Sequence, residues 1–163
     1  MIFGLTLHNF TLVHVGLSLV GVLAGLNVLL RMVRQRPLGA SNSIFLIATV
    51  ATSATGFFFP RTGITPGQIV GAISLAVLVL AAAALWLGNL YGTWRPIYVV
   101  SATIALWLNV MVGIIQAFAK IPHLHQYAPV GNEPIILVAQ GLALVCFIAL
   151  GYFAVKRFHP GGM

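Results

Sequence analysis

The sequence predicts an all-α protein, a polytopic transmembrane helix bundle of five spans. Its composition and its five long apolar runs both point to this class. Hydrophobic residues make up 60 % of the 163 residues and charged residues only 6 %, and the mean hydropathy is +1.06. A typical soluble domain is about half apolar and about a quarter charged. Lipid is therefore the solvent to which this chain is suited.

Five apolar runs supply the predicted spans. A helix needs about 20 mostly apolar residues to cross a hydrocarbon layer about 30 Å thick. The runs lie near residues 9–30, 43–59, 66–90, 97–119 and 134–155. Together they predict a single transmembrane domain over residues 1–163.

Proline-containing connections separate the runs, because a proline interrupts a helix. The fourth connection, about residues 120–133, is long enough to fold back over the bundle. The second run is the shortest and the richest in Thr and Ser, so we expect it to be the most buried among the others. The connections carry Pro37, Pro60, Pro96, Pro122, Pro129 and Pro134.

The basic residues predict the orientation, because Lys and Arg are retained on the cytoplasmic side of a membrane. With the N-terminus outside and the C-terminus inside, the cytoplasmic ends hold six basic residues and the outer ends two. The six are Arg31, Arg34, Arg36, Arg95, Lys156 and Arg157, and the two are Arg61 and Lys120. The sequence therefore favours an N-out, C-in topology.

Three of the predicted helices carry a stripe of small and polar residues at helical spacing. Such stripes lie against protein, because lipid cannot satisfy polar groups and small residues let helices approach closely. Helix packing is the simplest interpretation of all three, and Gly21 with Gly25 forms a GxxxG motif. The stripes are His14, Ser18, Gly21 and Gly25; Thr49, Ser53 and Gly56; and Gly67, Gly71 and Ser74.

The fourth predicted helix carries the most polar stripe. Asn109, Gly113, Gln116 and Lys120 follow one another at spacings of four, three and four. Hydrogen bonds between helices explain such a stripe in one interpretation, and a polar cavity for a ligand explains it in the other. Gln140 on the last helix and Gln68 at the start of the third are candidate partners. We take Asn109, Gln116, Lys120, Gln140 and Glu133 as candidate ligand-binding residues.

Four histidines are predicted to lie in the outer half of the molecule: His8, His14, His123 and His125. A neutral imidazole binds zinc, copper or haem iron, so His14, His123 and His125 are candidate metal ligands. A haem of the b type at the outer edge, or copper, is the minority hypothesis. Ordinary histidines at the membrane interface are the simpler explanation.

Glu133 is the only acidic residue of the chain. It precedes Pro134 at the predicted start of the last helix, where the helix dipole favours a carboxylate. It is also the only counter-ion that the chain offers to Lys120 or Arg61. We therefore expect it to cap this helix, or to close the fourth loop through an ion pair.

Several classes of function find no support in the sequence. No pair of carboxylates, no GxSxG and no HExxH motif is present, so hydrolytic catalysis has no visible machinery. No Asp or Glu lies within a span, which argues against a proton relay. The scattered basic residues form no nucleic-acid-binding face, and a lone cysteine excludes an intramolecular disulfide.

Four segments of the chain together carry a resemblance to other sequences. They are 55–60, the turn at Trp94 and Arg95, 105–109, and the run from Gln116 through Lys120, Pro122, His125, Pro129 and Glu133 to Gln140. With these segments the chain resembles a group of small bacterial inner-membrane proteins of unknown function. The resemblance covers most of the chain and implies no activity, cofactor or catalytic residue. It also implies that similar sequences have a histidine at the position of Gln68, so this chain lacks one potential metal ligand.

The sequence thus favours a multi-pass protein of the bacterial inner (cell) membrane that binds a small molecule or lipid without catalysis, or that serves as an accessory subunit of a membrane complex. A haem- or copper-binding redox module at the periplasmic face is one alternative. An oligomeric small transporter is another, because five spans alone enclose little space and small-residue stripes suit subunit packing. Expected partners are membrane lipid and either further copies of the chain or a larger membrane complex.

Overall fold

The computed structural model describes residues 2, 4–60 and 62–160 as an all-α fold. Five helices, the second of them extended by a 3-10 turn, are long and apolar enough to cross a membrane. The prediction of a five-span helix bundle is therefore confirmed. The helices are α1 (Leu7–Val33), α2 (Ala40–Thr55, extended by η1, Gly56–Phe58), α3 (Pro66–Trp86), α4 (Trp94–Lys120) and α6 (Pro134–Arg157), with the single turn α5 (Pro122–His125) between the last two.

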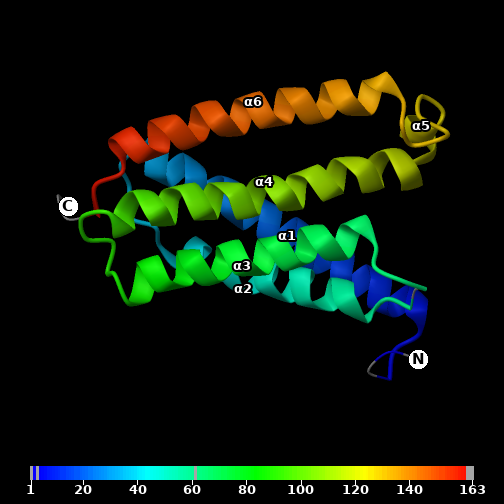
Figure 1. The fold of residues 1–163 in the computed structure, drawn as a ribbon, viewed down its shortest axis with the longest axis horizontal. Helices are drawn as coiled ribbons and strands as arrows, with labels where there is room; N and C mark the ends of the chain where they lie inside the picture. Colours follow the sequence, from blue (N-terminus) through cyan, green and yellow to red (C-terminus); the bar gives the residue numbers. More distant parts are fainter. Residues whose placement is uncertain (1, 3, 61, 161–163) are drawn as a thin grey trace.

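The long helices run up and down beside one another along the longest axis of the molecule (Figure 1). α1 packs against α2, α2 against α3, α3 against α4 and α4 against α1, while α6 contacts both α1 and α4. The two chain ends lie at opposite ends of the bundle, as an odd number of spans requires. We call these the N-terminal end and the C-terminal end of the bundle.

Local signals explain where two of the helices begin. At the start of α1 the Thr6 side chain accepts a hydrogen bond from the backbone N–H of Asn9. At the start of α3 Thr65 and Gln68 form a reciprocal capping box, with Pro66 in the first helical position. Both arrangements satisfy N–H groups that lack a partner within the helix.

The third and fourth spans differ from the predicted runs at the connection between them. α3 ends at Trp86 rather than near residue 90, and α4 begins at Trp94 rather than 97. Asn89 and Leu90 adopt positive φ angles of 47° and 58°, which end the helix although the segment is apolar. Pro96 lies in the first turn of α4, where its missing N–H costs no helical hydrogen bond.

α4 is the most buried span, which corrects the expectation that the second span would be. Within the most apolar stretch of each helix, 50 % of α4 is buried, against 33 % for α2 and 11 % for α6. The Thr and Ser content of α2 does not predict its burial, because burial depends on how many helices surround a span. α4 contacts α1, α2, α3 and α6. α6 lies at the periphery and presents most of its apolar surface to lipid.

Arg95 fixes the end of this peripheral helix against α4. Its guanidinium Nη1 donates to the backbone oxygens of Val155, at 2.9 Å, and Phe158, at 2.5 Å. The carbonyl groups at a helix C-terminus carry partial negative charge, which an arginine complements. The start of α4 and the end of α6 are thereby held together at the C-terminal end of the bundle.

The hydrophobic core occupies the half of the bundle next to the C-terminal end, which we call the packed half. The GxxxG motif contributes to it: a Cβ added at Gly25 would lie only 2.6 Å from Leu106 and 2.7 Å from Phe45. The predicted close approach of α1 to its neighbours is thus present. The core consists of Val28, Leu29, Met32, Phe45, Leu46, Leu78, Ala81, Ala84, Tyr98, Val99, Ala102, Ala105, Leu106, Phe147, Ala154 and Phe158.

Candidate ligand-binding cavity

The other half of the bundle, towards the N-terminal end, contains a cavity of about 310 Å³ between α1, α2 with η1, α3 and α4. We call this the hollow half. Its wall mixes apolar side chains such as Val15, Val70 and Val112 with many polar ones. The polar lining residues are Thr11, His14, Thr52, Ser53, Thr65, Gln68, Ser74, Asn109, Gln116 and Lys120.

The cavity extends from the N-terminal end to about the middle of the bundle. Asn109 and Lys120 both line it and lie eleven residues apart (120 − 109) on α4, which at 1.5 Å per residue is about 16 Å. That is about half of a hydrocarbon layer about 30 Å thick. Beyond Asn109 the bundle is filled by the core of the packed half.

Asn109 is the most buried amide of the cavity wall, with 8 % of its surface exposed. Its Oδ1 accepts a hydrogen bond from the Ser18 hydroxyl on α1 at 2.8 Å, so the predicted hydrogen bond between helices exists. Its Nδ2 has no partner in the described part of the chain. This amide therefore joins α4 to α1, while the side chain as a whole also lines the cavity.

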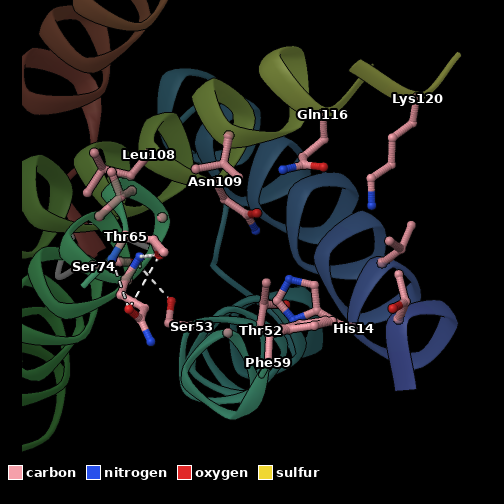
Figure 2. A pocket seen from close by; sticks show the side chains of 18 of the residues that line it. His14, Thr52, Ser53, Phe59, Thr65, Ser74, Leu108, Asn109, Gln116 and Lys120 are labelled. Atoms are coloured by element: carbon pink, nitrogen blue, oxygen red, sulfur yellow. Dashed lines mark hydrogen bonds between the residues drawn. The ribbon is translucent and has the colours of Figure 1, made fainter. Parts of the chain in front are cut away.

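Gln116 and Lys120 continue the same wall towards the N-terminal end, and both side chains are exposed. Figure 2 shows the Lys120 ammonium directed from α4 across the cavity towards His14 on the opposite wall, with the Gln116 amide between Lys120 and Asn109. The stripe predicted on the fourth helix thus faces a shared interior. Gly113, its remaining member, does not line the cavity.

His14 forms the facing wall on α1, and a hydrogen bond joins it to α2. Its Nδ1 lies 2.8 Å from the Thr55 hydroxyl oxygen. The same hydroxyl lies within hydrogen-bond distance of two carbonyl oxygens of its own helix, Ala51 O at 2.7 Å and Thr52 O at 3.1 Å. Phe59 packs edge-on against the imidazole, with ring centroids 5.2 Å apart.

Hydroxyl groups of α2 and α3 complete the lining. Ser53 donates to Ser74 across the two helices at 3.2 Å, so their stripes both pack together and line the cavity. Thr52 is a lining residue that the sequence reasoning missed, and its buried hydroxyl has no hydrogen-bond partner in the described part of the chain. The available signal was its position four residues before Gly56, which belongs to the stripe of that helix.

Gln68 and Gln140, the predicted partners of the fourth stripe, have other roles. Gln68 lines the cavity, but its Oε1 accepts from the Thr65 backbone N–H at 3.0 Å as part of the α3 cap. Gln140 contacts α4 through a bond from Nε2 to the backbone oxygen of Met111 at 2.9 Å. Gln140 is not part of the cavity wall.

Glu133 also lies away from the cavity, because its carboxylate is used by its own loop. It accepts hydrogen bonds from the backbone N–H groups of Val130 at 2.7 Å and Gly131 at 2.8 Å. These bonds, that from Val130 first, lower the pKa of the Glu133 carboxyl. Glu133 stands at the N-cap position of α6 but makes no side-chain cap hydrogen bond. The predicted N-cap position is therefore confirmed, but the carboxylate makes its hydrogen bonds to the loop and not to the first turn of α6.

The predicted ion pair and the predicted fold-back of the fourth loop also require correction. No ion pair joins Glu133 to Lys120 among the described residues, and Arg61 lies outside them. The loop stays at the end of the α4–α6 pair (Figure 1), and none of residues 121–133 lines the cavity. The turn α5 and the bonds to Glu133 satisfy its backbone locally.

The candidate metal ligands are not brought together. His14 lies in the cavity wall, whereas His123 and His125 are exposed on α5. Within the described ranges no three His, Cys, Asp or Glu side chains form a group that could hold a metal ion. His8 is likewise exposed near the start of α1.

The fold and the lining together define a five-span helical membrane protein with a polar cavity in one half of its bundle. Comparisons with protein-family models, with curated protein sequences and with solved structures found no match to this chain. They identify no family, so the resemblance to small bacterial inner-membrane proteins adds no assignment beyond this class.

Proposed function

We propose that this chain is a non-catalytic membrane protein that binds a small amphipathic molecule in the cavity of its hollow half. One observation carries the proposal: a cavity with a largely polar wall lies inside a bundle of apolar helices suited to lipid. Gln116 and Lys120 on α4 and His14 on α1 contribute polar groups to this wall, and valines line it beside them. Polar groups in such a bundle need hydrogen-bond partners, and a ligand with oxygen atoms would provide them. The volume lies at the lower limit of known ligand sites, about 300–1,000 Å³.

Binding fits the residues better than catalysis or transport does. The only acid of the chain is hydrogen-bonded in the fourth loop, so no carboxylate is available in the cavity as a general base. The cavity also ends at the core of the packed half, whereas a transport path has to continue to the other face. A cavity with one closed end suits a receptor or carrier of a ligand.

A probe of matched shape tests the proposal. Native mass spectrometry of the protein in a neutral maltoside detergent, with 1-dodecanol added, should show one dodecanol bound per chain. Gly67→Leu should abolish binding, because Gly67 lines the cavity and the nearest atom to an added Cβ is 4.0 Å away. Gly16→Leu is the control, since Gly16 has open space around it and lies outside the lining. Equal binding in both variants contradicts the proposal.

We further propose that the protein lies in the bacterial inner membrane with its N-terminus outside, which puts the open end of the cavity at the exterior face. The six-to-two distribution of basic residues supports this orientation. Fusions at the C-terminus test it. Green fluorescent protein fused there should fluoresce and alkaline phosphatase should stay inactive, and the reverse pattern would invert the orientation.

A further inference from the structure

The cavity contains a positive charge that no acid of the chain balances. Lys120 is the one side chain among the lining residues with a permanent charge, and it points into the cavity (Figure 2). The chain has a single acidic residue, and that carboxylate is occupied by Val130 and Gly131. A cation inside a membrane protein normally pairs with an anion or with carbonyl groups. Among the described residues no acid pairs with Lys120, so an anion from outside the chain is a suitable partner for it.

Hydrogen-bond donors accompany this charge on the same wall. Gln116 lies one turn from Lys120 on the same face of α4, and its amide lines the cavity with the ammonium group. His14 contributes its imidazole to the opposite wall. An oxyanion is thus expected beside α4, because hydrogen bonds that involve a charged group are the stronger ones.

The remainder of the wall fits an apolar body. Val15, Val70 and Val112 line the cavity beside the polar groups. Building on the proposed function, we infer that the ligand is an amphiphile with an oxyanion head, which pairs with Lys120 and accepts from the Gln116 amide one turn away on α4. Fatty acids and phosphate-headed lipids share this chemistry.

Matched probes separate head-group recognition from apolar binding. Dodecanoate, dodecyl phosphate and 1-dodecanol have the same chain and differ in the head, and each is titrated calorimetrically into the protein in a neutral maltoside detergent. We expect the better anionic probe to bind one per chain, at least about tenfold more tightly than dodecanol. Tighter binding of dodecanoate would identify the ligand class as fatty acids, and tighter binding of dodecyl phosphate would identify it as phosphate-headed lipids.

Variants at Lys120 locate the charge that is responsible. Lys120→Gln should remove the preference for the better anion, so that its affinity relative to dodecanol falls about tenfold, while Lys120→Arg should keep that preference. Lys156→Gln is the control, because Lys156 lies over the Tyr152 ring on α6, outside the cavity. A loss of anion preference in this control would contradict the assignment to Lys120.

Two outcomes overturn the inference in different ways. If dodecanol binds as tightly as both anions and Gly67→Leu abolishes its binding, the cavity binds amphiphiles but does not select an oxyanion. In that case the proposed function stands and the inference fails. If Gly67→Leu changes the binding of no probe, the proposed function fails as well. Should Lys120→Gln not fold, the preference of the wild-type protein among the three heads still decides.

Discussion

The packed half and the hollow half are built by the same helices but differ in how their side chains fill the space between them. In the packed half Gly25 brings α1 so close to α2 and α4 that no Cβ would fit. In the hollow half the same helices enclose a cavity of about 310 Å³. Close packing drives helix association in lipid, where no hydrophobic effect operates between helices. The packed half therefore supplies most of the stability and leaves the hollow half available for binding.

The largest expected difference between the halves concerns large side chains. Phe45 has 1 % of its surface exposed, so Phe45→Ala should lower the free energy of unfolding by about 3–5 kcal/mol. Val112→Ala, in the wall of an existing cavity, should cost about 1 kcal/mol or less, because it creates little new empty space. Unfolding in mixed micelles with increasing dodecyl sulfate measures both values. Equal costs would remove the distinction between the halves.

Glycines give the next largest contrast. Gly25→Ala should destabilise by about 1–3 kcal/mol through overpacking against Leu106 and Phe45. Gly113→Ala is the matched change on α4, where an added Cβ meets nothing within 4 Å. It should be neutral or should stabilise by about 0.5–1 kcal/mol, because alanine favours the helix. The same unfolding measurement compares them, and a tolerated Gly25→Ala would show that α1 can move away.

A buried hydrogen bond sharpens the description of the packed half. The Tyr98 hydroxyl donates to Asn42 Oδ1 and joins α4 to α2, and both residues are buried. Tyr98→Phe leaves the Asn42 oxygen without a donor and should cost about 1–2 kcal/mol. Tyr152→Phe is the control, since 54 % of Tyr152 is exposed on α6. Similar unfolding energies for the two variants would show that this bond adds nothing.

The hollow half should respond more weakly to the loss of one of its interhelical bonds. Ser18→Ala removes the donor to Asn109 and should cost about 0.6 kcal/mol, the average for such bonds in a membrane. Thr11→Ala is the control, because the Thr11 hydroxyl donates only to the Leu7 carbonyl of its own helix. A cost above about 2 kcal/mol would mean that this half is packed as firmly as the other.

The smallest effect is expected in the fourth loop. The pKa of Glu133 is lowered by the N–H groups of Val130 and Gly131, so its carboxylate stabilises the loop above its unfolded pKa. That contribution is lost as the pH falls through the folded pKa. Amide hydrogen exchange at Val130 and Gly131, corrected for intrinsic rates, should therefore accelerate at acidic pH. Glu133→Gln should abolish this pH dependence. If the exchange rates of the variant still depend on pH in this way, a group other than Glu133 is responsible.

Hydropathy alone predicted the five spans, because their length and composition are set by the thickness of the membrane. It placed the end of α3 too late, since the turn after Trp86 depends on backbone angles at Asn89 and Leu90 and the segment itself is apolar. The helical spacing of Asn109, Gln116 and Lys120 correctly predicted a shared wall. The partners of that wall could not be predicted, because the bond from Ser18 to Asn109 depends on how α1 and α4 pack.

The hydrogen-bond partners of Gln68 and Glu133 were also predicted incorrectly from the sequence. Gln68 was interpreted as a tertiary partner, but its distance of three residues from Thr65 makes a local cap the stronger option. Glu133 was expected to find a distant cation, yet two backbone N–H groups only two and three residues away were closer. Local hydrogen bonds are formed at small entropic cost and therefore prevail over long-range ion pairs in such loops.

The membership of the cavity wall has a consequence for biosynthesis. Every residue that lines the cavity belongs to the first 120 residues, and α6 contributes none. During translation the whole wall therefore leaves the ribosome before the last span is made. Four helices are thus enough to enclose the cavity, and α6 packs on the outside of them, where Arg95 holds its end.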